Sequence, residues 1–160
     1  MFIIREITKD DNLNLSNVIR EVLVEIGVPK KGTAYSDPEL DFMFEAYNKK
    51  RSIYYVVEYD EKIYGGAGIS HLNEADHNIC ELQKMYFLPS IRGKGLGDQM
   101  IEKCLSFALD NKFEYCYIET LPYMKKAQKL YIKKGFSYIE GPIGNTGHTS
   151  CNVWLIKNLK

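Results

Sequence analysis

The stretch 92-RGKGLGD-98 is the part of the sequence whose residue types and spacing most directly indicate chemistry. It follows an apolar, strand-like run that ends at Pro89, and it precedes a segment with helical spacing of apolar residues. A helix that begins after such a loop has unpaired backbone N–H groups and a partial positive charge at its first turn. Glycines let phosphate oxygens approach these amides, and Arg92 and Lys94 add charge. The pattern predicts an anion site, with a purely structural turn as the alternative.

The spacing of the glycines excludes the two commonest phosphate loops. The dinucleotide-binding pattern G-x-G-x-x-G would place its third glycine at position 98, which is Asp98. The P-loop pattern requires Ser or Thr after G-K, whereas Gly95 follows Lys94. The pattern that remains is R-x-x-G-x-G, from Arg92 to Gly97.

Three motifs together resemble those of the GNAT superfamily, the acetyl-coenzyme A-dependent N-acetyltransferases. R-x-x-G-x-G resembles the family's pyrophosphate loop, 81-ELQKMYFLP-89 its preceding strand, and 127-AQKLYIKKGF-136 its later helix. They occur in the family's order and with its spacing. The resemblance implies an enzyme that moves an acetyl group from acetyl-CoA to a primary amine of a small molecule or peptide by direct attack. A non-catalytic acyl-CoA-binding regulatory module of the same fold is the alternative.

The resemblance also implies where acetyl-CoA binds. The strand backbone at Met85, Tyr86 and Phe87 would pair with the pantetheine arm like an added strand, and an amide near Met85 would polarise the thioester carbonyl. Lys129 is a candidate for the 3′-phosphate, as are its neighbours Lys125 and Lys126. No role is predicted for Met124, which stands where the family often has Asn. The pyrophosphate would lie against the loop amides of Arg92, Gly93, Lys94, Gly95, Leu96, Gly97 and Asp98.

Glu81 and Tyr131 are the candidate catalytic residues by the same resemblance. Glu81 occupies a position where the family often has a general base, acting directly or through water, and Glu119 and His71 are the alternatives. Tyr131 matches the tyrosine that protonates the departing thiolate, a transfer that a phenol with a pKa near 10 can make. A core aromatic is the alternative for Tyr131. Simple alternation along the strand would place Glu81, Gln83, Met85 and Phe87 on one face.

The elements that must position these residues predict an α/β (α+β) fold. Periodicity and turn residues predict a mixed, mostly antiparallel seven-stranded sheet flanked by helices on both faces, in one domain spanning residues 1–160. The helix between strands 79–88 and 114–120 should make those two strands parallel. Three glycines in strand 62–72 indicate a bulge or close packing. The remaining predicted strands are 2–7, 53–59, 136–140 and 151–157, and the helices are 10–26, 38–50, 96–110 and 124–134.

The composition is that of a soluble globular protein, with 45% hydrophobic and 26% charged residues. Basic and acidic residues number 21 each, so no basic excess indicates nucleic acid. No apolar run is long enough to span a membrane and no signal peptide is evident, so a cytoplasmic location is expected. The dispersed cysteines and histidines predict reduced thiols and no metal site. Loops 27–38 and 141–150 should shape the acceptor site, the acceptor itself stays open, and the resemblance allows a homodimer.

Overall fold

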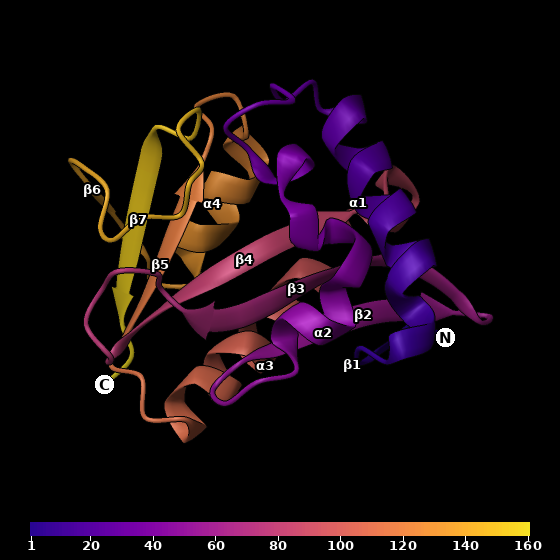
Figure 1. The fold of residues 1–160 in the computed structure, drawn as a ribbon, viewed down its shortest axis with the longest axis horizontal. Coiled ribbons are helices and arrows are strands. Elements are labelled where there is room, and N and C mark those ends of the chain that lie inside the picture. Colours follow the sequence, from indigo (N-terminus) through magenta and orange to yellow (C-terminus); the bar gives the residue numbers. More distant parts are fainter.

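A seven-stranded mixed sheet organises the structure, a computed structural model that describes residues 1–160 (Figure 1). The strand order is β1-β2-β3-β4-β5-β7-β6, and β4 and β5 are the parallel pair. All other neighbours are antiparallel, as predicted. The strands are β1 (Ile3–Glu6), β2 (Ile53–Tyr59), β3 (Lys62–His71), β4 (Ile79–Phe87), β5 (Tyr115–Thr120), β6 (Ser137–Ile139) and β7 (Val153–Asn158).

Helices cover both faces of the sheet, which confirms the predicted layers. Alternating residues of β2 show why: Tyr55 and Val57 pack in one core, whereas Tyr54 and Val56 pack in the other. The helices α1 (Asn12–Glu25) and α2 (Met43–Tyr47) cover the face nearer the viewer in Figure 1. The opposite face is covered by α3 (Leu96–Asp110) and α4 (Lys125–Lys133).

The second predicted helix differs most from its prediction of residues 38–50. Pro38–Phe42 form a 3₁₀ helix, and only Met43–Tyr47 are α-helical. The two parts are separate because Phe42 has φ −135° and ψ 45°, outside the helical region. Elsewhere the four cysteines are free thiols, and no group of three or more His, Cys, Asp or Glu side chains is arranged to hold a metal ion. None of the helices has the length and apolar character needed to cross a bilayer.

The parallel strands β4 and β5 pair only at one end. Residues 79–81 of β4 lie opposite residues 115–117 of β5, and no pairing between these strands extends beyond Glu81. From there β4 keeps its hydrogen bonds to β3, while β5 keeps its hydrogen bonds to β7. Figure 1 shows the two strands meeting near the C-terminus and diverging toward α4. One edge of β4 therefore presents unpaired backbone groups from about residue 82 onward.

A β-bulge at Lys84 divides β4 into two halves. Gly66 and Gly68 of β3 lie opposite Tyr86 and Gln83, so one residue of β4 is extra, and Lys84 has a left-handed φ of 49°. Met85 and Phe87 consequently pack on the α3 side, with Cys80 and Leu82. Glu81 and Gln83 point to the α1–α2 side instead. The prediction that Glu81, Gln83, Met85 and Phe87 share a face is therefore wrong, because the bulge shifts the alternation after Gln83.

Glycines of β3 make room for a tyrosine that holds this bulge. A Cβ atom at Gly66 would lie 2.5 Å from Cε1 of Tyr54, and one at Gly68 would lie 2.6 Å from its Cδ2. The Tyr54 ring is fully buried across these glycines, and its hydroxyl donates to the carbonyl of Lys84 at 2.7 Å. The predicted close packing at the glycines is thus confirmed, whereas the bulge at Lys84 lies in the neighbouring strand β4; the irregularity of β3 itself lies opposite Val57 and Glu58 of β2.

Candidate active site

A cavity of about 670 Å³ lies beside the unpaired edge of β4 and extends to the N-terminus of α3. Its walls combine β4, the glycine loop and α4, the three segments that carry the family motifs. Of the predicted donor-site residues, Met85, Tyr86, Phe87, Arg92, Gly93, Gly95, Gly97 and Asp98 line it, together with Tyr131. Leu96 packs in the core instead, and Lys94 is exposed outside the lining.

The glycine loop offers a run of unpaired backbone donors. From Gly93 to Asp98 no backbone N–H group donates to an acceptor of this chain, and the residue before α3, Gly95, provides no side-chain cap. Gly93 and Gly95 have φ of 75° and 80°, and an added Cβ at either would meet nothing within 4 Å. Glycine is required there by backbone conformation. The uncapped helix terminus fits a bound diphosphate.

The third glycine of the loop, Gly97, is required by the packing of two helices and not by the approach of a ligand. A Cβ at Gly97 would lie 2.9 Å from Cδ2 of Leu130 on α4. Gly97 therefore lets α3 and α4 approach each other beside the cavity.

The charged residues of the loop are mostly paired within the protein. Arg92 donates to the carbonyl of Phe87 at 3.0 Å and to Glu25 of α1 at 2.6 Å, so it ties the loop to the strand and to α1. Asp98 forms ion pairs with Lys133 and Lys134. Lys129 is absent from the cavity lining, whereas Lys125 and Lys126 at the start of α4 are part of it. Of the three lysines predicted as candidates for the 3′-phosphate, the structure thus brings Lys125 and Lys126, but not Lys129, to the cavity lining.

Tyr131 combines a core ring with a hydroxyl available for chemistry. The ring packs edge-on against Phe136, and only 6% of the residue is exposed. Tyr131 lines the cavity, and no hydrogen bond contributes to the pKa of its hydroxyl. Burial raises the pKa of Tyr131 to about 12, so the phenol is protonated at neutral pH. The two readings of Tyr131 are thus compatible.

A second cavity, of about 530 Å³, opens on the α1–α2 side of β4. Residues 34–39 and residues 145–151 contribute to its walls, so the two loops expected to shape an acceptor site do meet around it. Glu81 and Gln83 line its β4 side. Tyr86 lines both cavities, so the two spaces adjoin at this residue.

Glu81 is a buried carboxyl group in this second cavity, with 6% of the residue exposed. Burial, with a smaller contribution from the nearby Glu119, raises the pKa of Glu81 to about 7 even though a hydrogen bond from Gln83 opposes the shift. That bond, from the Gln83 amide, is 2.6 Å long, and Gln83 in turn accepts one of 2.5 Å from the Tyr47 hydroxyl. A carboxyl group with this pKa can take up a proton near neutral pH.

Comparison with known proteins shows to which family the chain belongs. The model of the acetyltransferase (GNAT) family matches residues 20–136. The chain belongs to the GNAT family of acetyltransferases. It is 40% identical over 158 residues to YjgM, an uncharacterized N-acetyltransferase of Escherichia coli (strain K12), covering 98% of this chain and 95% of YjgM. Acetyl-CoA is the donor that this GNAT enzyme uses.

Solved structures show the same GNAT fold. A GNAT acetyltransferase from Staphylococcus aureus Mu50 superposes with a TM-score of 0.87 at 20% identity, over 100% of both chains. The acetyltransferase yncA from Salmonella typhimurium, solved with its cofactor acetyl-CoA, gives a TM-score of 0.79 at 15% identity, over 99% of this chain and 94% of its own.

Sequence reasoning missed an ionic network beside the candidate base of this GNAT enzyme. The Lys84 ammonium, whose side chain is 4% exposed, pairs with Asp37 at 3.2 Å and Glu39 at 2.5 Å. His148 binds Asp37 at 2.9 Å. Burial lowers the pKa of Lys84, but Glu39 and Asp37 outweigh it and the net pKa is raised. A lysine amid the apolar residues of a strand was the one available signal.

The two alternative bases are engaged in other contacts. Glu119 accepts hydrogen bonds of 2.6 Å from both Tyr117 and Thr146. The Nε2 atom of His71 lies 2.9 Å from the carbonyl of Ala75, in an exposed turn at the cavity margin. Glu81 therefore remains the strongest candidate for the base.

Proposed function

We propose that Glu81 deprotonates the acceptor amine of this N-acetyltransferase and that Tyr131 protonates the coenzyme A thiolate. The observation that carries the proposal is that Tyr86 lines both cavities, with Glu81 in one and Tyr131 in the other. An acceptor on the Glu81 side would thus meet a thioester held on the Tyr131 side.

The donor cavity has the groups that acetyl-CoA requires. Backbone amides from Gly93 to Asp98 would bind the pyrophosphate, and the unpaired edge of β4 at Met85 would pair with the pantetheine arm. When bound, acetyl-CoA supplies a thioester carbon open to attack by an amine. Lys125 and Lys126, which line this cavity, would supply positive charge for the 3′-phosphate.

The transfer balances with these two side chains. The amine nitrogen bonds to the thioester carbon, the carbon–sulfur bond breaks, and the thiolate departs. Glu81 accepts the proton that the amine loses, directly or through water, because its raised pKa suits it to that exchange. Tyr131 donates a proton to the thiolate, and return of a proton from Glu81 through solvent to the Tyr131 oxygen restores both side chains.

The cysteines favour direct attack over an acyl-enzyme. Cys80, Cys104 and Cys116 are completely buried. Cys151 lines the acceptor cavity, but burial raises its pKa to about 12, so it is a thiol and not the nucleophilic thiolate.

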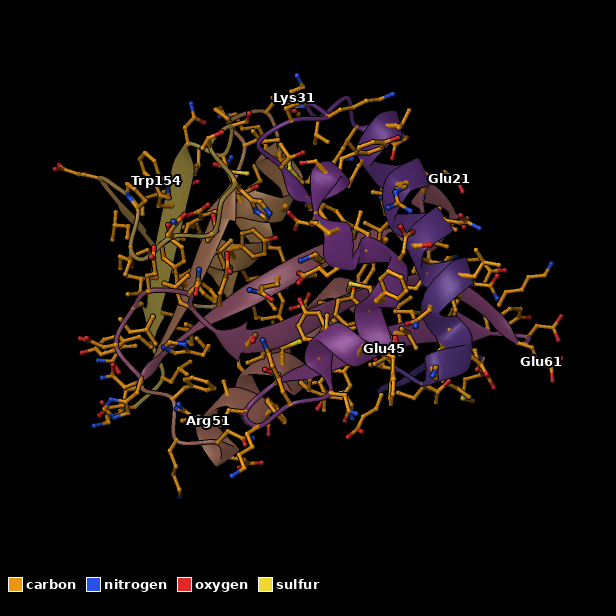
Figure 2. The ribbon with its side chains drawn as sticks, in the orientation of Figure 1. Glu21, Lys31, Glu45, Arg51, Glu61 and Trp154 are labelled. Carbon is orange, nitrogen blue, oxygen red and sulfur yellow. The ribbon has the colours of Figure 1, made fainter.

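Glu81→Gln tests the base. We expect kcat/KM for thiol release with a responsive amine to fall by about 10²–10⁴-fold, while acetyl-CoA still raises the melting temperature. Glu21→Gln, on the outer face of α1 (Figure 2), should change neither quantity. Full activity in Glu81→Gln would contradict the role. Stabilisation by acetyl-CoA without thiol release on any amine would support the regulatory-module alternative.

Tyr131→Phe tests the acid. The variant keeps the ring that packs against Phe136 and removes only the hydroxyl, so turnover should fall about tenfold or more while the thermal shift with acetyl-CoA persists. Equal loss of turnover and acetyl-CoA binding would show that Tyr131 only holds the cavity wall.

A further inference from the structure

The charges that line the acceptor cavity divide into those that the protein pairs internally and those that it does not. Lys84, Asp37, Glu39 and His148 form one connected ionic network. Its members neutralise one another and hold the loop at residues 37–39 against β4. They are therefore poor candidates for recognising a substrate charge.

Two carboxyl groups remain on the inner side of the cavity. Glu81 is buried, and its only side-chain hydrogen bond is to Gln83. Glu119 is held by the hydroxyls of Tyr117 and Thr146 and forms no ion pair with a cation of the chain. These two groups can receive the amine end of an acceptor.

Two exposed lysines without an ion pair also line the cavity, and we take their position as its opening, or mouth. Lys49 and Lys50, in the loop between α2 and β2, line this cavity, and both also line an adjoining cavity of about 490 Å³. Both are exposed, and neither forms an ion pair with a carboxylate of the chain. Figure 2 labels Arg51, the residue that follows them, at the end of this loop. The cavity is thus acidic inside and basic at its opening.

We propose that the acceptor is a small amine that also carries an anionic group, a carboxylate or a phosphate. Its amine would lie toward Glu81 and Glu119, and its anion toward Lys49 and Lys50. The inference rests on the proposed function, since it assigns the acceptor to this cavity. A volume of about 530 Å³ suits a small molecule of this kind.

Charge matching explains why the anion matters. A neutral amine would leave both lysines unmatched, and a polyamine would place a second cation beside them. An anion at the mouth would instead attract both lysines, orient the molecule and direct its amine inward. The two lysines are therefore specificity-determining residues and not catalytic ones.

Matched pairs of amines test the proposal. Each anionic amine is compared with a neutral counterpart: an amino acid with its amide, and an aminoalkyl phosphate with the corresponding amino alcohol. We expect kcat/KM for thiol release to be at least about tenfold higher for the anionic member of one pair. The pair that shows this preference distinguishes a carboxylate from a phosphate.

The double variant Lys49→Gln/Lys50→Gln tests whether these two lysines recognise the anionic group of the acceptor. It should raise KM for the anionic amine about fivefold or more, leave its kcat nearly unchanged, and leave neutral amines unaffected. Added salt should weaken binding of the anionic amine to the unsubstituted enzyme and much less to the variant. The matched control Lys9→Gln/Lys62→Gln removes two exposed lysines outside both cavities and should change nothing.

Binding provides a readout that does not depend on turnover. In the presence of coenzyme A, the anionic amine should raise the melting temperature of the unsubstituted enzyme and do so less in the double lysine variant. Equal kcat/KM for both members of every pair, or a preference that survives in the variant, would overturn the inference alone. Thermal stabilisation by anionic amines without thiol release from acetyl-CoA would support the inference and contradict the proposed catalysis.

Discussion

The pKa of Glu81 depends on one hydrogen bond as well as on burial. Burial raises the pKa to about 7, and the amide of Gln83 opposes that shift by donating to the carboxylate. Gln83→Met keeps a similar volume and removes the donor, so the pKa of Glu81 should rise further. The acidic limb of the pH profile of kcat/KM should move to higher pH, with about a threefold to tenfold loss at pH 7.

A companion substitution separates this effect from a general disturbance. Tyr47→Phe removes the bond to the other end of Gln83 but leaves the amide beside Glu81. Its pH profile should move less than that of Gln83→Met. Coincident profiles for Gln83→Met and the unsubstituted enzyme would show that the hydrogen bond does not tune the base.

The donor residues could be predicted from the sequence because they lie in short contiguous motifs. A loop such as 92–98 keeps its glycines and its helix start in any fold that contains it. The network of Asp37, Lys84 and His148 could not be predicted, because its members come from three distant segments and meet only in the folded chain. The sequence also does not show that Lys125 and Lys126, but not Lys129, line the donor cavity, because helical spacing alone does not tell which turn of α4 faces it.

At the scale of elements, the bulge in β4 determines which side chains reach which cavity. Strand periodicity predicted the existence of β4 but not its change of face, since an inserted residue leaves no mark on the apolar pattern. The glycines of β3 were the indirect sign, because their missing side chains admit the Tyr54 ring that holds the bulge carbonyl. The bulge of β4 therefore depends on residues of two neighbouring strands, β3 and β4, together with Tyr54 of β2.

Gly66→Ala should test this pairing of strands. The added Cβ would lie 2.5 Å from both the Tyr54 ring and the carbonyl oxygen of Tyr55, and the backbone oxygen cannot move freely. We expect a loss of about 1–3 kcal/mol in the free energy of unfolding, measured with denaturant. Gly141→Ala, where an added Cβ meets nothing within 4 Å, should leave stability nearly unchanged. An unaltered denaturation midpoint for Gly66→Ala would refute the close packing.

At the scale of the whole molecule, the acceptor side makes folding stability depend on pH. The folded state raises the pKa of Glu81 from 4.5 to about 7, so between these values the folded chain holds a proton that the unfolded chain releases. Stability therefore falls as pH rises through this window. The pKa of His148 is also raised: burial lowers it, but Asp37 outweighs that effect. The stability from this ion pair is complete below pH 6.5 and is lost as pH rises through the folded pKa.

Glu81→Gln separates these two contributions. The melting temperature of the unsubstituted protein should fall between about pH 5 and pH 8, and part of that fall should disappear in the variant. At pH 8 the variant should be more stable by on the order of 3 kcal/mol, because it no longer buries a charge, whereas at pH 4 the two should match. Glu21→Gln should follow the unsubstituted protein throughout. A parallel fall in Glu81→Gln would mean that Glu81 is not held near neutral pKa, and the same result would weaken its role as base. Loss of activity together with a gain of stability at pH 8 would show that the fold maintains this carboxyl group at the expense of its own stability.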